Sequence, residues 1–214
     1  LIDFHIDDAV VDAFEVPQKN PTGHNRMMYA VVARSNDVRA LIDRLTHAGL
    51  RLEVVDIPEF ALRNIASLLP EDSGGVALLH LGAERGLIVI TRQQKLYMSR
   101  RIETGLAALP ETAIHAGNHD TIEDWLDVII REIQRSLDYY DSHFSAPPVS
   151  GIVICPTGQE IPGMTQYVSD QLGIPARLLD VNGIIDCETP LDAATQEDCL
   201  LAIGAALRLE TRTL

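Results

Sequence analysis

Two glycine-containing turns are the parts of this sequence best suited to bind a small anion. The first, Gly82-Ala-Glu-Arg-Gly86, joins two apolar runs that have the pattern of β-strands. Glycines let a backbone approach a phosphate closely and adopt the positive φ angles of anion-binding nests. The same residues also suit an ordinary hairpin turn, so phosphate contact and a purely structural role both stay open.

The second turn, Pro156-Thr-Gly-Gln-Glu-Ile-Pro-Gly163, follows the apolar run Gly151-Ile-Val-Ile-Cys155 and precedes a helical pattern. Open α/β sheets bind ligands at such places, where a strand passes into a helix at the carboxyl edge of the sheet. The prolines and glycines of this turn suit a structural role equally well, and that alternative also stays open.

The histidines His115 and His119, followed by Asp120, have the i,i+4 spacing with which a helix presents two metal ligands. Gly117 and Asn118 lie between them and disfavour a helix, so we predict a solvated loop there and no metal site. The sequence contains no Gly-x-Ser-x-Gly elbow, P-loop or His-Glu-x-x-His motif, so it offers no anchor for the corresponding hydrolase, NTPase and zinc-protease chemistries.

The composition argues against several classes of protein. The 17 Lys and Arg residues against 31 Asp and Glu give a formal charge of −14, which disfavours a nucleic-acid binder. No apolar run approaches the roughly 20 residues that a membrane span needs, and the 46% of hydrophobic residues indicates a soluble globular chain. Cys155, Cys187 and Cys199 lack CxxC spacing, which disfavours a disulfide framework or a zinc site and favours a reducing compartment.

The first part of the chain has the pattern of a small α/β piece that begins without an initiator Met, as a fragment of a longer protein would. Its β-type runs are bounded by turn residues, and its helical runs repeat apolar residues at three- and four-residue steps. The predicted elements are strands 10–16 and 26–34 joined by a turn at 17–24, a helix over 35–48, a strand over 50–57 and a helix from Pro58.

A compositional break at Glu71-Asp-Ser-Gly-Gly75 precedes a different pattern, so we predict a first part over residues 1–73 and a second domain over 74–214. The predicted elements of the second domain are strands 76–81, 86–91 and 95–99, a helix over 121–143, a strand over 151–155, a helix through 167–172, a strand over 176–180 and a helix over 199–209. This βββαβαβα order predicts an RNase-H-like α/β domain with a mixed sheet flanked by helices.

Five short runs spread along the chain carry a family resemblance. They include Val76-Ala-Leu-Leu-His-Leu-Gly-Ala83 and Ala202-Ile-Gly-Ala-Ala-Leu-Arg208, and the full set is residues 45–63, 76–83, 98–105, 132–140 and 202–208. In this order they resemble the PilM family of actin-like type IV pilus assembly proteins. The resemblance covers nearly the whole chain and is closest to the MshI branch, which serves the mannose-sensitive haemagglutinin (MSHA) pilus.

The resemblance implies an actin/Hsp70-like fold in which part of a small α/β subdomain precedes the RNase-H-like domain, and in which the family's first subdomain is missing. It implies a cytoplasmic adaptor or scaffold rather than an enzyme, held at the inner membrane through its partners, the inner-membrane pilus assembly proteins. Two alternatives stay open, an ATPase of the actin superfamily and a cytoplasmic adaptor of type II secretion. No cofactor is expected in this fragment, and ATP with Mg²⁺ remains a candidate for the full-length protein.

The resemblance also maps the second phosphate hairpin onto residues 79–83, with His80 where relatives carry an acidic residue, and the adenosine-contacting turn onto residues 156–158. A neutral imidazole is a poor ligand for Mg²⁺, which prefers oxygen, so we expect a degenerate site without ATP hydrolysis. Remaining nucleotide contacts are expected at two turns that face one cleft, on Gly82, Glu84, Arg85, Thr157, Gly158 and Gln159.

Overall fold

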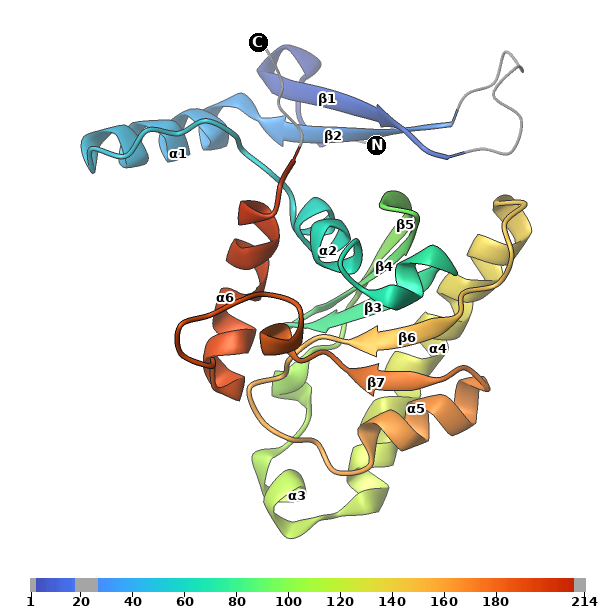
Figure 1. The fold of residues 1–214 in the computed structure, drawn as a ribbon. Helices are drawn as coiled ribbons and strands as arrows, with labels where there is room; N and C mark the ends of the chain where they lie inside the picture. The colour runs from blue at the N-terminus through green and yellow to red at the C-terminus, as the bar shows by residue number, and fades with distance from the viewer. Residues whose placement is uncertain (1–2, 18–26, 210–214) are drawn as a thin grey trace. The chain divides into compact units, whose positions relative to one another are not determined.

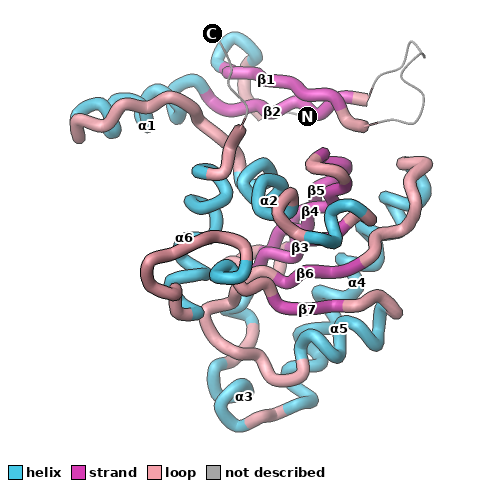
Figure 2. Tube along the Cα trace, in the orientation of Figure 1, coloured by secondary structure: helices cyan, strands magenta, loops and turns pink. Residues whose placement is uncertain are grey.

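The computed structural model describes residues 3–17 and 27–209, which Figure 1 draws as a ribbon and Figure 2 colours by secondary structure. The chain forms two compact units, Leu1–Asp56 and Ile57–Leu214. The turn predicted at 17–24 lies, apart from its first residue, outside the described residues. The division into parts 1–73 and 74–214 stays a prediction.

The first unit contains an antiparallel hairpin followed by a helix, as predicted. Strand β1 (Ala9–Glu15) pairs with β2 (Met28–Arg34), and α1 (Ser35–His47) follows directly. The strand predicted over 50–57 is wrong, because these residues pair with no strand anywhere in the described chain. A strand needs a partner strand for its backbone N–H and C=O groups. A pattern of alternating apolar residues does not supply that partner.

The second unit is a mixed five-stranded sheet with helices on both faces. Its main elements, in chain order, are α2 (Pro58–Ala66), β3 (Val76–Leu81), β4 (Gly86–Arg92), β5 (Lys95–Ile102), α3 (Glu111–Ala116), α4 (His119–His143), β6 (Gly151–Ile154), α5 (Met164–Leu172), β7 (Ala176–Leu178) and α6 (Ala193–Ala206). The strand order is β5-β4-β3-β6-β7, with antiparallel β3–β4 and β4–β5 pairs and parallel β3–β6 and β6–β7 pairs. Helices α2 and α6 pack together over one face, and α4 and α5 cover the other.

This arrangement confirms the predicted RNase-H-like layout, with α3 as an addition. The segment around His115 was predicted as a loop, and that prediction is wrong in part, because α3 ends just beyond this residue and α4 begins at His119. Gly117 separates the two helices with a left-handed φ of 61°. The two histidines therefore belong to different helices and do not share a helix face.

Helix α4 confirms the prediction of a long, central helix. Asn118 caps it by accepting a hydrogen bond from the Thr121 backbone N–H at 3.4 Å, and its apolar face is buried at the spacing of a helix. The buried residues of α4 are Ile122, Trp125, Leu126, Ile129, Ile133, Ser136, Leu137 and Tyr140. Within the described ranges, none of the helices has both the length and the hydrophobicity that a membrane crossing requires.

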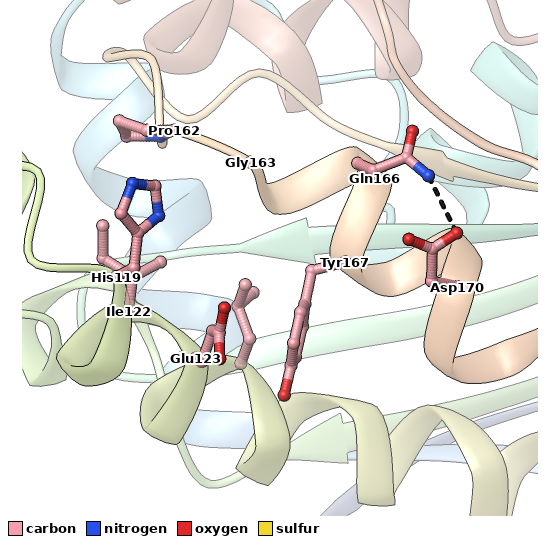
Figure 3. Close-up of a pocket in the computed structure, with 9 residues that line it drawn as sticks. His119, Ile122, Glu123, Pro162, Gly163, Gln166, Tyr167 and Asp170 are labelled. Carbon is pink, nitrogen blue, oxygen red and sulfur yellow. Dashed lines mark hydrogen bonds between the residues drawn. The ribbon is translucent and has the colours of Figure 1, made fainter.

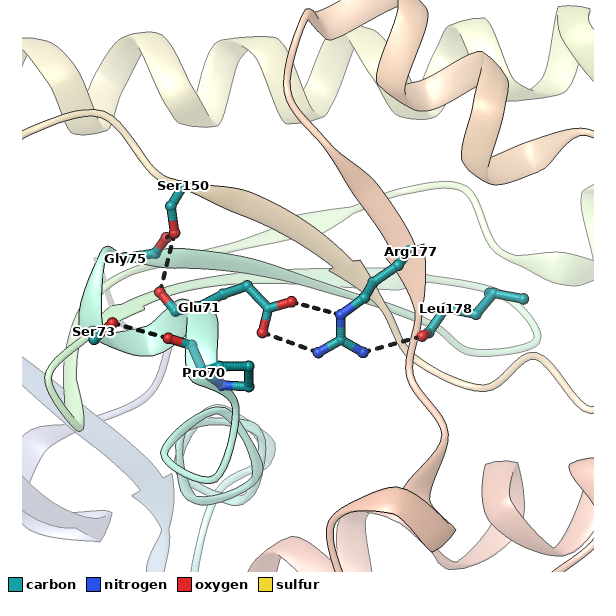
Figure 4. Close-up of polar contacts among 7 residues, drawn as sticks. All are labelled: Pro70, Glu71, Ser73, Gly75, Ser150, Arg177 and Leu178. Carbon is teal, nitrogen blue, oxygen red and sulfur yellow. Dashed lines mark hydrogen bonds and ion pairs between the residues drawn. The ribbon is translucent and has the colours of Figure 1, made fainter.

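A short 3₁₀ turn, Pro70–Ser73, is tied to the amino-terminal edge of the parallel strands. The Glu71 carboxylate accepts two hydrogen bonds from the Arg177 guanidinium of β7, at 2.6 Å from Nε and 3.0 Å from Nη2 (Figure 4). Ser150 Oγ, next to β6, lies 3.2 Å from the backbone carbonyl of Glu71 and 2.9 Å from that of Gly75. The bidentate pair with Arg177 holds the pKa of Glu71 below its usual range.

The neighbouring Asp72 is buried and supports the turn between β4 and β5. Its carboxylate accepts hydrogen bonds from Thr91 Oγ1 at 2.7 Å and from the Gln94 backbone N–H at 2.6 Å. Gln93 and Gln94 have φ angles of 51° and 65°, a conformation that residues other than glycine seldom adopt. Asp72 therefore stabilises a turn whose conformation Gln93 and Gln94 disfavour.

The segment that follows β5 contacts the hairpin between β3 and β4 and stabilises it. Leu106 N–H donates to Gly82 C=O at 2.9 Å, and Ala107 N–H donates to Ala83 C=O at 2.8 Å. A Cβ on Gly105 would stand 2.6 Å from the backbone nitrogen of Arg85, so only glycine fits there. The backbone C=O of Gly105 in turn accepts a hydrogen bond from Trp125 Nε1 at 3.2 Å, which fixes this segment on α4.

The ion pair of Glu71 predicts a pH-dependent contribution to stability. The side chains of Glu71 and Arg177 are 22% and 42% exposed, so solvent screening limits the effect of Glu71→Gln to about 1 kcal/mol of unfolding free energy at pH 7. The folded pKa of Glu71 is lowered from the usual 4.5, so the stabilisation is complete above that value and is lost as the pH falls through the lowered pKa.

Urea unfolding of the wild type and of Glu71→Gln at neutral pH and near pH 3 measures this difference. Glu188→Gln, at an exposed carboxylate, is the matched control. An equal difference at both pH values would show that the charge of Glu71 is not the cause.

The support behind the β3–β4 hairpin predicts that Gly105→Ala destabilises the fold. The φ angle of Gly105 is −126°, which alanine tolerates, so the cost comes only from the collision with the hairpin, about 1–3 kcal/mol. Thermal unfolding measures it, with Gly183→Ala as control because a Cβ there meets no atom within 4 Å. Equal stability of the two variants would contradict the close packing described here.

Candidate functional site

The two candidate turns lie at the same edge of the sheet of the second unit. Strands β3 and β6 are parallel neighbours, paired in register from Val76↔Gly151 to Leu79↔Ile154. The first turn follows β3 directly, and the second follows β6. The parallel pairing therefore brings all six predicted contact residues to the carboxyl edge of neighbouring strands, and their binding of a nucleotide stays a prediction.

The first turn is exposed and carries both signs of charge. Gly82 N–H donates to the carbonyl of Arg85 at 2.9 Å, which closes a tight hairpin, and the Glu84 side chain is exposed to solvent. Arg85 Nε lies 3.2 Å from a carboxylate oxygen of Glu103, but these side chains are 62% and 75% exposed. Such a pair is weak in water, so Arg85 stays available to an anionic group.

The second turn is partly covered by a carboxylate from α6. Thr157 is buried and its Oγ1 donates to the carbonyl of Gln159 at 2.7 Å, while Gly158 has a φ of 69°. The Glu197 carboxylate occupies the space that a Cβ on Gly158 would fill. Burial, and then the nearby charge of Asp198, raises the pKa of Glu197. An acidic group thus lies against the turn that was expected to contact adenosine.

Glu197 is a residue that the sequence patterns missed. It belongs to α6, whose start the apolar pattern placed at residue 199, although Asp192 caps the helix by accepting a hydrogen bond from Thr195 N–H at 2.8 Å. The N-cap at Asp192 is a local signal that extends α6 over Glu197. The contact with Gly158 has no such signal, because it depends on where two distant segments meet.

His80 occupies the second-last position of β3, opposite Leu87 of β4. Its Nδ1 is buried and forms no hydrogen bond within the described part of the chain, and burial lowers the pKa of the imidazole, which is therefore neutral at pH 7. Cys155 follows β6 at the same edge, and burial raises its pKa to about 12. The thiol stays protonated, so this edge offers no cysteine nucleophile.

These donors do not fit a bound Mg²⁺. The ion requires an octahedron of oxygen ligands, usually with one or two carboxylates, whereas His80 offers nitrogen at the strand end. Glu84 and Glu103 are exposed on the turn and beside it, and among the residues that the structure describes no three His, Cys, Asp or Glu side chains gather as a metal site would require.

Comparison with solved structures identifies the fold. The chain matches PilM in a PilM–PilN type IV pilus biogenesis complex with a TM-score of 0.71 and 20% identity, over 96% of this chain and 67% of that one. It matches MreB5 of Spiroplasma citri bound to ADP with a TM-score of 0.51 and 12% identity, over 82% of this chain and 65% of that one. The fold is therefore that of actin-like ATPases, and the chain spans about two thirds of the length of these proteins.

Comparison at the level of sequence identifies the family. No curated protein matches the chain significantly. The family profile described as type IV pilus assembly protein PilM matches residues 1–116, which is more than half of the 214 residues. That match extends from the hairpin of the first unit through β3, β4 and β5 to the end of α3. The chain belongs to the PilM family of type IV pilus assembly proteins.

Proposed function

We propose that this chain is a cytoplasmic protein-binding scaffold in the assembly of an MSHA-like type IV pilus, held at the inner membrane through its partners. The observation that carries the proposal is the PilM family match together with the PilM fold over 96% of the chain. The five sequence runs that resemble the MshI branch support the narrower assignment to an MSHA-like system.

The proposed partner is a counterpart of PilN among the inner-membrane pilus assembly proteins. The similar PilM structure is a complex of PilM with PilN, which supports a protein partner for this chain. The net charge of −14 adds support, because it disfavours polyanions such as nucleic acid as the main ligand.

ATP turnover is the competing function, and the chemistry of the turns disfavours it. The similar MreB5 structure is bound to ADP, so the fold accepts a nucleotide in that protein. Here His80, at the end of β3, is neutral and offers no negative charge to a metal ion. The carboxylate of Glu197 lies against Gly158 and offers no positive charge to a polyphosphate. Phosphoryl transfer therefore lacks the charges that stabilise its transition state. Contacts of Gly82, Arg85 and Thr157 with a nucleotide remain compatible with binding that does not lead to hydrolysis.

The scaffold proposal predicts the recovery of pilus assembly proteins. The full-length protein with an affinity tag is expected to co-purify with a PilN counterpart from cells that express an MSHA-like pilus, and not from cells without the pilus genes. Mass spectrometry of the eluate measures this. Recovery of type II secretion proteins alone, or of neither group, would overturn the assignment.

The site chemistry predicts no phosphate release from Mg·ATP by the full-length wild-type protein. A site that does not hold the metal ion in place loses roughly several kcal/mol of transition-state stabilisation. Phosphate release by the wild type, His80→Asp and Glu84→Ala is the measurement. Release by His80→Asp alone would support a degenerate site, because a carboxylate restores an oxygen ligand. Release by the wild type that disappears in Glu84→Ala would show instead that Glu84 organises the metal.

A further inference from the structure

A pocket lies between the first turns of α4 and the helix α5, beside Pro162 and Gly163 at the end of the second turn. Figure 3 shows side chains of both helices directed into the space between them, with Pro162 and Gly163 at one end. The pocket has a volume of about 180 Å³. Its lining includes Ile122, Glu123 and Leu126 of α4, Pro162, and Tyr167 and Asp170 of α5.

The size and floor of this pocket suit a single apolar side chain. Pockets for small-molecule ligands usually measure roughly 300–1,000 Å³, so this one is too small for a nucleotide or a comparable cofactor. Ile122 and Leu126 are each 1% exposed and form an apolar floor, which Pro162 extends. An inserted aliphatic side chain would be removed from water there, which is the usual role of an anchor residue at a protein interface.

The rim of the pocket is acidic. Glu123 of α4 and Asp170 of α5 are exposed on opposite sides of it, and Tyr167 OH donates to Asp127 Oδ1 at 2.9 Å. The hydrogen bond to Asp127, then partial desolvation, and then the charges of Asp127, Glu123 and Asp124 raise the pKa of Tyr167. The phenol therefore lies in a negative potential created by residues of α4.

Basic side chains do not offset this charge on the two helices that form the pocket. Helix α5 contains no Lys or Arg, and α4 contains none before Arg131. Asp120 lies in the first turn of α4, where a carboxylate stabilises the helix end. Asp127 and Asp170 lie beyond the first turns of their helices, so capping does not account for them. Gln166 Nε2 donates to Asp170 Oδ1 at 2.8 Å and holds this carboxylate at the rim.

We infer that the pocket between α4 and α5 docks a segment of a partner protein that inserts one aliphatic side chain and places Lys or Arg against Glu123 and Asp170. An apolar floor inside an acidic rim is complementary to a segment of that kind, and charged rims select partners and speed their association. The inference rests on the proposed scaffold function only in taking the occupant to be a protein.

Three probe peptides test the chemistry of the docking segment directly. They have Gly-Ser flanks around a core of Lys-Leu-Lys, Glu-Leu-Glu or Lys-Ser-Lys, and NMR titration follows the amides of α4 and α5 in the full chain. We expect Lys-Leu-Lys alone to shift the pocket residues, and the shifts to weaken with added salt. Shifts that are equal for the acidic peptide, or that salt does not change, would overturn the inference.

Charge reversal at the rim tests which residues select the peptide. The double variant Glu123→Lys, Asp170→Lys is expected to bind the Lys-Leu-Lys peptide about tenfold more weakly, because two attractive contacts become repulsive. Both side chains are exposed, so the fold should tolerate the change. Asp141→Lys, at an exposed carboxylate near the other end of α4, is the matched control. Equal loss in the control would show an effect of net charge and not of the pocket.

Co-purification separates this inference from the proposed function. If the wild type and the double variant recover the same pilus proteins in the same amounts, the docking inference fails and the scaffold function stands. If the wild type recovers none while the purified chain still binds Lys-Leu-Lys at the pocket, the scaffold function fails and the docking chemistry stands. A PilN counterpart that the wild type recovers and the double variant loses supports both.

Discussion

The pairing of β3 on both its sides is the constraint on which the arrangement of the second unit depends. It forms an antiparallel ladder with β4 and a parallel ladder with β6, so the hairpin starts from this strand and the strand that follows the crossover through α4 pairs with it. Apart from His80, every residue of β3 is buried. A slip by one residue would turn a whole row of these side chains to the other face of the sheet. The edge at which the two turns meet is therefore determined by the core, with or without a ligand.

The hairpin that carries the first turn is held by contacts of the backbone. Leu106 and Ala107 hold the first turn through backbone hydrogen bonds, which do not depend on the charges that the turn displays, and Trp125 fixes this segment on α4 through the carbonyl of Gly105. His80 and Glu197 can therefore occupy positions that suit neither a metal nor a polyphosphate without loss of the hairpin geometry. Acidic side chains also surround the apolar pocket between α4 and α5.

The sequence predicted the elements whose signals are local and long. The apolar period of α4, the three short strands after residue 75 and the run at β6 each specify one structure, because burial of one face or both leaves few alternatives. The strand expected over 50–57 failed because its pattern could not indicate a partner strand. The two turns were predicted to face one cleft because both lie at strand ends of the actin-like fold that the resemblance implies. The contact of Glu197 with Gly158 could not be, since it depends on the path of the chain between β7 and α6.

The carboxylate of Asp72 has a consequence for the order in which the chain folds. A hairpin turn with Asn and Gly forms from its own residues, whereas Gln93 and Gln94 in left-handed conformations each cost about 1 kcal/mol. The compensating hydrogen bonds come from a residue that precedes β3 in the chain. The β4–β5 hairpin is therefore a poor independent nucleus, and its closure is coupled to the arrival of the Pro70–Ser73 segment. The turn that joins β4 and β5 is therefore expected to form as slowly as a contact between residues that are far apart in the sequence.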